Sequence, residues 1–169
     1  MKKKPDINIS INDEYIFRNS CSYGNIDIVK WLLQIKPDIN ISARNEHAFR
    51  SSCSGGFIEL AKFLLIKKPD IDLETDSEYT FQNICDNGHF DMAKWYLTIN
   101  PYLNISSNYS RALRNAVTSG HFEIVKWLFN MNPDIKIENY NMIFSNSCTN
   151  GKKVIVRMLY YLIMIILVI

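Results

Sequence analysis

The sequence predicts an all-α repeat solenoid, built from stacked helix–turn–helix units with short extended arms. The first observation is a stretch such as "GNIDIVKWLL" that recurs along the chain, beginning at Gly24, Gly56, Gly88, Gly120 and Gly151. The second is a proline that returns every 32 residues, at Pro5, Pro37, Pro69, Pro101 and Pro133. A period of about 20 to 50 residues is typical of repeat architectures, in which neighbouring units share one continuous core.

The two periodicities divide the 169-residue chain into repeat units. We expect a repeat array over residues 1–151, with units near 5–36, 37–68, 69–100, 101–132 and 133–162, and an apolar C-terminal tail at residues 163–169. The opening "KKKPD" resembles "IKKPD" inside the array, which leaves open an upstream portion of the array.

The segment before each glycine predicts a short first helix. A large apolar residue lies four positions before a small one in four units, which places the two on one helical face. The glycine divides this helix from the next, because glycine tolerates the left-handed conformation that often follows a helix end. The paired core positions are Phe17 with Cys21, Phe49 with Cys53, Phe81 with Cys85, and Leu113 with Val117.

The segment after each glycine predicts an amphipathic second helix. Ile28, Trp31, Leu32 and Ile35 follow the i, i+3, i+4, i+7 pattern of one apolar face. The same pattern recurs at residues 124–131 as Ile124, Trp127, Leu128 and Met131. An acid in the first turn complements the helix dipole in four units, and the proline ends the helix. The stretch after proline alternates apolar and polar residues, which favours a short extended arm.

These residues resemble ankyrin repeats. "GHFEIVKWLF" is very close to the family's Gly-His-x-Glu-Ile-Val-Lys-x-Leu-Leu second-helix pattern, and "PDINI" resembles its Ala-Asp-Val-Asn arm. The resemblance covers about residues 5–160. The family's Thr-Pro-Leu-His opening appears here as "YIFR", "HAFR", "YTFQ", "RALR" and "MIFS", so the detailed turn geometry departs from the family. The Ile-, Asn- and Lys-rich style resembles the ankyrin arrays of giant DNA viruses of amoebae.

Composition and motifs exclude most catalytic classes. The chain has 19 basic and 17 acidic residues, and this balance predicts no nucleic-acid partner. Phosphate-binding loops, zinc-protease motifs and nucleophile elbows are missing from the sequence. We therefore expect no enzyme, no catalytic residues and no cofactor.

Cysteines, histidines and tryptophans have structural interpretations. The four cysteines occupy one equivalent repeat position, where neighbours are about 8–10 Å apart, too far for a disulfide or a zinc site. We therefore predict packed, reduced thiols and no metal, as in an intracellular protein. His89 and His121 follow repeat glycines and are expected to begin second helices. The tryptophans share one second-helix position with a phenylalanine and are expected to pack in the core or between repeats: Trp31, Trp95, Trp127 and Phe63.

The resemblance implies a non-enzymatic protein–protein interaction module. In ankyrin arrays the contacts come from arm tips and from the exposed side of the first helices. We expect one or more protein partners, a monomeric chain, and an intracellular location, which is the host-cell cytoplasm if the origin is viral. The positions that correspond to these contacts vary between repeats: Asn12, Glu14, Ser22, Tyr23, Arg44, Glu46, Ser54, Asp76, Glu78, Asp86, Asn87, Asn108, Ser110 and Thr118. At one of these, Asp86, replacement by alanine is expected to change stability by at most about 0.5 kcal/mol, as at an exposed site.

The apolar C-terminus suggests two alternatives to a simple binding module. The run from Met158 to Ile169 is shorter than the about 20 residues that a membrane-spanning helix needs. We expect its first part to close the stack, and Ile163–Ile169 to remain exposed and to contact a membrane surface or another chain. The alternatives are thus a membrane-associated ankyrin protein, or a truncated family member without present function.

Overall fold

The computed structural model describes residues 10–101, 103, 105–131, 148–149, 151, 153, 156 and 160. For residues 105–110 it describes the backbone alone. Eight α-helices and no strand are found in these residues. The helices are α1 (Ile11–Ser22), α2 (Ile26–Ile35), α3 (Ala43–Ser54), α4 (Ile58–Lys67), α5 (Ser77–Asp86), α6 (Phe90–Ile99), α7 (Ile105–Ser119) and α8 (Phe122–Met131).

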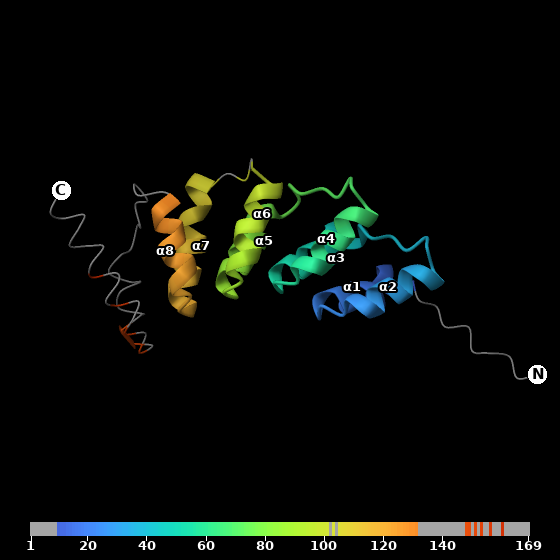
Figure 1. The fold of residues 1–169 in the computed structure, drawn as a ribbon, viewed down its shortest axis with the longest axis horizontal. Helices are drawn as coiled ribbons and strands as arrows, with labels where there is room; N and C mark the ends of the chain where they lie inside the picture. Colours follow the sequence, from blue (N-terminus) through green and yellow to red (C-terminus); the bar gives the residue numbers. More distant parts are fainter. Residues whose placement is uncertain are drawn as a thin grey trace, which may run out of the picture. The chain divides into compact units, whose positions relative to one another are not determined.

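The helices form stacked pairs, one pair in each of the first four expected units (Figure 1). We call these pairs repeats 1 to 4. Contacts divide the chain into two compact units, residues 1–80 and 81–169, and each is described by itself. In the first unit α1 packs against both α2 and α3, and α3 packs against α4. In the second unit α7 packs against α8. The predicted all-α fold class is confirmed.

The first helices supply the core positions that the sequence predicts. Phe17, Phe49, Phe81 and Leu113 are at most 1% exposed, and their partners Cys21, Cys53, Cys85 and Val117 are fully buried. Large apolar side chains removed from water are the main favourable contribution to folding. The cysteine expectation fails at the equivalent position of the fifth unit, because Cys148 is exposed.

The second helices bury only part of the face that the i, i+3, i+4, i+7 pattern predicts. In α2 the buried residues are Val29 and Leu32, whereas Ile28, Trp31 and Ile35 are 45–55% exposed. At Ile28 the difference follows from the place of repeat 1, which has no earlier helix pair beside it in the part of the chain that the structure describes, because the equivalent Leu60 and Ile124 are 2% and 1% exposed. In α8 the prediction is correct for Ile124 and Leu128, which are buried. It is wrong for Met131, which is 47% exposed.

The glycine between the two helices of a repeat allows close approach of the next repeat. Gly24 has a φ of 70°, and a Cβ placed there would lie 2.5 Å from the Phe57 ring. Gly88 has a φ of 79°, and a Cβ there would lie 2.4 Å from the His121 ring. Both the left-handed backbone and the missing side chain are therefore needed at these positions.

The arms between repeats contain turns as well as residues that belong to no helix, turn or strand, and the extended conformation expected for them stays a prediction. Their apolar positions nevertheless reach the core, because Ile39, Ile71 and Leu103 are 5–6% exposed. Their charged positions pair locally, as Lys36 does with Asp38 at 3.1 Å. These contacts fix where each arm leaves the helices.

The C-terminal expectations fall mostly on residues that the structure does not describe. The tail Ile163–Ile169 lies outside the described residues, as does most of the fifth unit at 133–162. Among the helices that the structure describes, none combines the length and the apolar character needed to cross a membrane.

Candidate protein-binding surface

An uncommon left-handed turn joins arm and helix in two repeats of the first unit, and it lies inside the bounds given for α1 and α3. Asn12, Asp13 and Glu14 have φ angles of 53°, 54° and 60°. The equivalent residues of repeat 2, at 44–46, have φ angles of 54°, 55° and 57°. Each such residue costs about 1–2 kcal/mol relative to the right-handed conformation, so the surroundings must hold the turn.

An arginine from the following helix turn holds each of these arms. The Arg18 guanidinium donates from Nε to the Asp13 carbonyl at 2.7 Å and from Nη2 to the Asn12 carbonyl at 3.0 Å. Arg50 makes the same two bonds to the carbonyls of Asn45 and Arg44, at 2.7 and 3.5 Å. The arginine stands where the ankyrin opening has histidine, so it replaces that residue as the donor to the turn.

A glutamate completes each turn from the other side. Glu14 accepts a hydrogen bond from Ser10 Oγ at 2.8 Å, and Glu46 accepts one from Ser42 Oγ at 2.7 Å. Each glutamate also accepts a longer bond from a backbone N–H of the next arm, at 3.5 Å from Asn40 or Asp72. The carboxylates therefore link one arm to the next.

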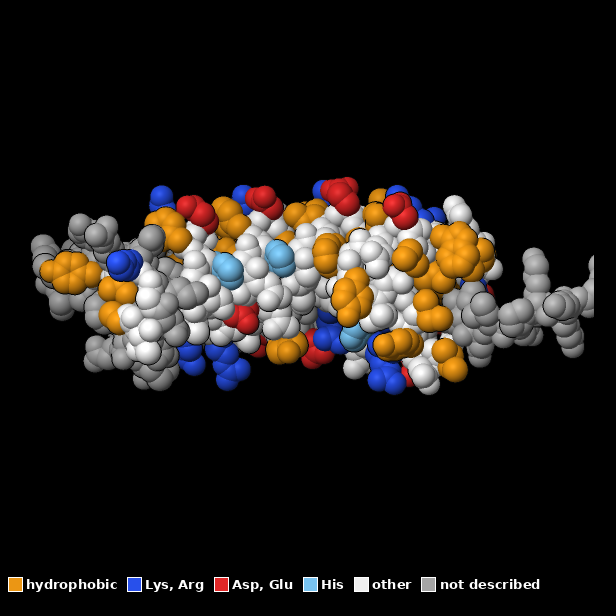
Figure 2. All heavy atoms as spheres, turned by 90° about the horizontal axis from the view of Figure 1, so that it is seen from below, with side chains coloured by type: hydrophobic (Ala, Val, Ile, Leu, Met, Phe, Trp, Pro, Cys, Tyr) orange, Lys and Arg blue, Asp and Glu red, His pale blue; other side chains and the backbone are white. Residues whose placement is uncertain are grey.

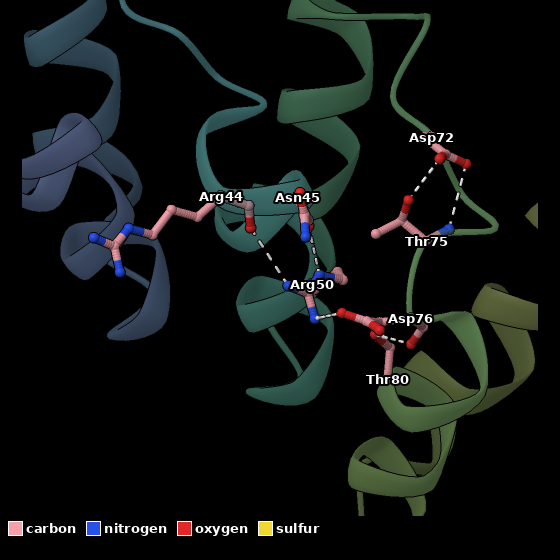
Figure 3. A network of polar contacts seen from close by, with 7 residues as sticks. All are labelled: Arg44, Asn45, Arg50, Asp72, Thr75, Asp76 and Thr80. Atoms are coloured by element: carbon pink, nitrogen blue, oxygen red, sulfur yellow. Dashed lines mark hydrogen bonds and ion pairs between the residues drawn. The ribbon is translucent and has the colours of Figure 1, made fainter.

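The third arm is built differently (Figure 3). Asp72 accepts hydrogen bonds from the Thr75 hydroxyl at 2.5 Å and from the Glu74 backbone N–H at 2.9 Å. Only Asp76 of this arm has a positive φ, 50°, and the Thr80 hydroxyl donates to its carbonyl at 3.0 Å. An aspartate turn thus takes the place of the left-handed triplet.

Ion pairs connect the arm tips of the first unit. Arg44 pairs with Asp13 at 3.0 Å, and both side chains are more than half exposed. Arg50 pairs with Asp76 at 2.8 Å while it also holds its own arm, as Figure 3 shows. Exposed pairs contribute little stability, so the Arg44–Asp13 pair mainly fixes the pattern of charge on this surface.

Comparison with known families agrees with this architecture. A family model described as ankyrin repeats (3 copies) matches residues 50–139. A second model, ankyrin repeats (many copies), matches residues 20–65. The chain belongs to the ankyrin repeat family. A search of curated proteins gives no significant match to the chain. Ankyrin repeats are generally protein-binding modules and are typically not enzymes.

The predicted contact residues of this ankyrin repeat protein fall into four groups. Exposed members lie on arm tips and first-helix ends, and half-buried members lie at the last turn of a first helix. The side chains of Asn108 and Ser110 lie outside the described residues. The exposed members are Asn12, Tyr23, Arg44, Asp76, Glu78, Asn87 and Thr118, and the half-buried ones are Ser22, Ser54 and Asp86.

The remaining two predicted contact residues are buried. Glu14 and Glu46 are each 7% exposed, because their carboxylates point into the arm turns. A side chain with so little exposure offers almost nothing to a partner, and we leave both out of the surface proposed below. A repeated Ser-x-x-x-Glu-x-x-x-Arg pattern at Ser10 and Ser42 is the sequence signal that could have revealed this role.

Exposed tyrosines of the first unit were missed in part by the sequence reasoning. Tyr15 and Tyr79 are 52% and 61% exposed, and Tyr23, which was predicted, is 70% exposed. Tyr15, His47 and Tyr79 occupy one first-helix position at intervals of 32 residues, which is the signal for a row of ring side chains. Tyrosine is enriched in protein interfaces because it combines a large apolar ring with a hydroxyl group.

Asp86 has a structural role in the second unit. Its Oδ1 accepts a hydrogen bond from Ser119 Oγ at 2.6 Å, and its carbonyl oxygen lies 2.7 Å from His121 Nε2. Both partners belong to the next repeat. The expectation of a negligible stability effect at Asp86 is therefore replaced by a moderate one.

The buried thiols are poorly suited to chemistry. Burial raises the pKa of Cys21 to about 12 despite a hydrogen bond from Ser52, and burial raises the pKa of Cys85 to about 12 as well. Thiols with such a pKa carry almost no thiolate near neutral pH, and the thiolate is the nucleophile and the metal ligand. In the part of the chain that the structure describes, no group of three His, Cys, Asp or Glu residues could hold a metal ion.

Proposed function

We propose that this ankyrin repeat protein is a non-enzymatic module that binds a protein through the arm tips and the exposed side of the first helices. The observation that carries the proposal is the set of exposed tyrosines on the first helices of the first unit, Tyr15, Tyr23 and Tyr79. These rings are not needed for packing, whereas the opposite side of the same helices supplies the core. Rigid tyrosines at a preformed surface are effective contact residues.

Charged and polar arm tips surround these rings. Both signs of charge are present within the first unit, in the ion pairs Arg44–Asp13 and Arg50–Asp76. Such a mixed surface favours a partner with both apolar and charged groups, which fits a folded protein better than nucleic acid. The further proposed contact residues, some of them in the second unit, are Asn12, Ser22, Ser54, Glu78, Asp86, Asn87, Asn108, Ser110 and Thr118.

The setting of this function is part of the proposal. Cys21, Cys53, Cys85 and Cys148 are free, which supports a reducing intracellular compartment. The resemblance of the Ile-, Asn- and Lys-rich sequence to arrays of giant DNA viruses of amoebae supports a viral origin, with the host-cell cytoplasm as the place of action. Membrane contact is proposed only for Ile163–Ile169. Such a contact does not anchor the chain in the bilayer, so alkaline extraction of membranes should release the full chain into the soluble fraction.

Affinity purification with matched variants tests the binding surface. A tagged Tyr23→Ala/Tyr79→Ala variant should lose a partner that the parent chain captures from its native cell. The control is Ile66→Ala, because Ile66 is 75% exposed on the second helix of repeat 2. A partner that is retained by the tyrosine variant and lost by the control would place the contacts on the second helices and overturn the proposal.

A further inference from the structure

The turn between α5 and α6 contains an asparagine directly before its glycine. Asn87 is exposed, so water reaches its side-chain amide. The equivalent position holds Tyr23, Gly55 and Ser119 in the other three repeats, so this turn alone among the four has an Asn–Gly pair. Such a pair favours loss of the asparagine amide, because Gly88 has no side chain to block the approach of its own nitrogen to the Asn87 side-chain carbonyl carbon.

The nitrogen that would attack is weakly held. The Gly88 N–H donates to the Cys85 carbonyl at 3.3 Å. The glycines at the equivalent position, Gly24, Gly56 and Gly120, make the same bond at 3.1, 3.0 and 3.1 Å. Backbone bonds usually have an N···O distance of about 2.9–3.0 Å, so the bond of Gly88 is long. Its amide is therefore the one most easily freed among these four turns.

Shorter bonds hold the rest of this turn. The Asn87 N–H donates to the Asn83 carbonyl at 2.9 Å, and the His89 N–H donates to the Ile84 carbonyl at 3.1 Å. The Gly88 amide can thus be freed by the loss of one hydrogen bond while the turn stays in place. A single net hydrogen bond corresponds to a factor of about two to ten in such an opening equilibrium.

We propose that Asn87 is a site of spontaneous modification, at which the Gly88 nitrogen attacks the Asn87 side-chain carbonyl carbon and closes a succinimide ring. A bond forms between this nitrogen and Cγ, and the bond between Cγ and Nδ2 breaks. Nδ2 leaves as ammonia together with the proton of the Gly88 amide. Water then opens the ring at one of its two carbonyl carbons, and it is the only co-reactant.

The two ring openings give different products. Attack of water at Cγ gives aspartate, which keeps the backbone and adds a negative charge beside Asp86. Attack at the main-chain carbonyl carbon of residue 87 gives isoaspartate, in which the backbone runs through Cγ. Isoaspartate therefore inserts an extra methylene group into the main chain directly before Gly88.

The junction between repeats 3 and 4 has no room for a longer turn. A Cβ on Gly88 would lie 2.4 Å from the His121 ring, and His121 Nε2 lies 2.7 Å from the Asp86 carbonyl oxygen. Figure 2 shows histidine side chains reaching the surface of the second unit. Isoaspartate should push Gly88 and the Asp86 carbonyl out of register with this ring and loosen the junction, whereas aspartate should leave it intact.

Peptide mapping of the full chain tests the site. Incubation in mildly alkaline buffer should convert Asn87 from amide to acid, with a mass shift that grows with time. A methyltransferase specific for isoaspartate should label part of the product. The matched control is Asn87→Ser, the residue that repeat 4 has at this position, and it should show neither change in this turn. Trypsin cleavage after Lys94 and Lys136 places the other Asn–Gly pair, Asn150–Gly151, in a different peptide.

The same incubation in urea measures how far the folded turn protects the amide. Because one long hydrogen bond holds the Gly88 nitrogen, the folded chain should convert Asn87 only about two- to tenfold more slowly than the unfolded chain.

Thermal unfolding tests the effect on the junction. The aged parent should melt at a lower temperature than the fresh parent, whereas aged and fresh Asn87→Ser should melt alike. Any change at Asn150 is common to both proteins and cancels in this comparison. Fresh Asn87→Asp carries the charge without the longer backbone, and it should melt like the fresh parent.

Three outcomes would overturn the proposal. The first is an Asn87 that keeps its amide in the folded chain while it loses the amide in urea, because the folded turn then protects it. The second is an aged parent that contains isoaspartate at residue 87 and is as stable as the fresh one. The third is a fresh Asn87→Asp that is as unstable as the aged parent, which would assign the loss to charge and not to the lengthened turn.

Discussion

Two repeat junctions of the same design use different chemistry. In the first unit, the junction between repeats 1 and 2 places the Phe57 ring against Gly24. In the second unit, the junction between repeats 3 and 4 places the His121 ring against Gly88. The backbone positions are equivalent, but only the histidine adds a polar contact, 2.7 Å from its Nε2 to the Asp86 carbonyl.

The comparison shows that the repeat determines the shape of a junction but not the polarity of the ring that fills it. Each junction needs a planar ring over a glycine with positive φ, and the ring can be apolar or polar. The polar junction gains a further bond from Ser119 to Asp86, whereas the apolar one has a bond from the Asn40 backbone N–H to the Glu14 carboxylate. Stability in a repeat protein is approximately a sum over such junctions and the repeats themselves.

A charge introduced into the buried core of a first helix should produce the largest effect. Leu113 is fully buried in α7, so Leu113→Asp places an unpaired carboxylate in the core and should cost about 4 kcal/mol. Urea denaturation measures the loss. Arg111→Asp on the exposed side of the same helix is the control and should change the free energy of unfolding by less than about 0.5 kcal/mol. Equal losses in the two variants would mean that Leu113 is not in the core.

The glycine position should produce the next effect. Gly88→Ala adds a methyl group 2.4 Å from His121 atoms and forces alanine to a φ of 79°, so we expect a loss of about 2–3 kcal/mol. Thermal unfolding of Gly88→Ala, of His121→Asn and of the double variant separates the two causes, because His121→Asn alone measures the loss of the contact with the Asp86 carbonyl. The second substitution should restore the part due to the clash and leave the part due to the backbone. A single variant as stable as the parent would show that the close approach is wrong.

The arm clamp of the first unit should have a smaller effect. Arg50 holds the carbonyls of Arg44 and Asn45 and pairs with Asp76, so Arg50→Ala should cost about 1.5 kcal/mol. Arg50→Lys keeps the charge but carries its three donors on one nitrogen in place of the planar fork of arginine, and it should recover less than half of the loss. Chemical denaturation of the two variants checks this order. Full recovery with lysine would mean that charge, and not the fork of donors, holds the arm.

The sequence predicted the helix pairs and their first-helix core well, because the same residue types recur at the same positions of every repeat. It could not predict the arms. Three successive left-handed residues such as Asn12, Asp13 and Glu14 have no glycine to announce them, and contacts made after folding stabilise them. The sequence could not predict the exposure of Ile28 either. Equivalent positions of the repeats carry similar apolar residues, and their exposure depends on what packs beside each repeat. The binding surface stays a prediction.

Removing the side-chain hydrogen bond of the second junction should have a moderate effect. Asp86→Ala deletes the acceptor of the Ser119 hydroxyl and should cost about 1 kcal/mol, twice the limit expected for a surface site. The control is Asn87→Ala, because Asn87 is exposed at the next position. Equilibrium unfolding in urea distinguishes the two. If both variants matched the parent, the hydrogen bond would contribute nothing and the junction would depend on ring packing alone.

Acidification should have the smallest effect on stability, and the effect should arise at His89 in the second unit. Burial, and next the neighbouring His121, lower the pKa of His89 below its ordinary value near 6.5. The unfolded chain therefore binds a proton more readily than the folded chain. This contribution to stability is fully present above the unfolded pKa of about 6.5 and is lost as the pH falls from there through the folded pKa.

His89→Asn tests this contribution with a residue that the chain already uses at the equivalent position, Asn25. We expect the melting temperature of the variant to fall less than that of the parent between about pH 7.5 and pH 5.5, a range above the ordinary pKa of carboxylates. His47, whose pKa is lowered by burial and then by nearby arginines, remains in both proteins and gives a common background. An equal or larger fall in the variant would show that His89 is protonated as readily in the folded chain as in the unfolded one.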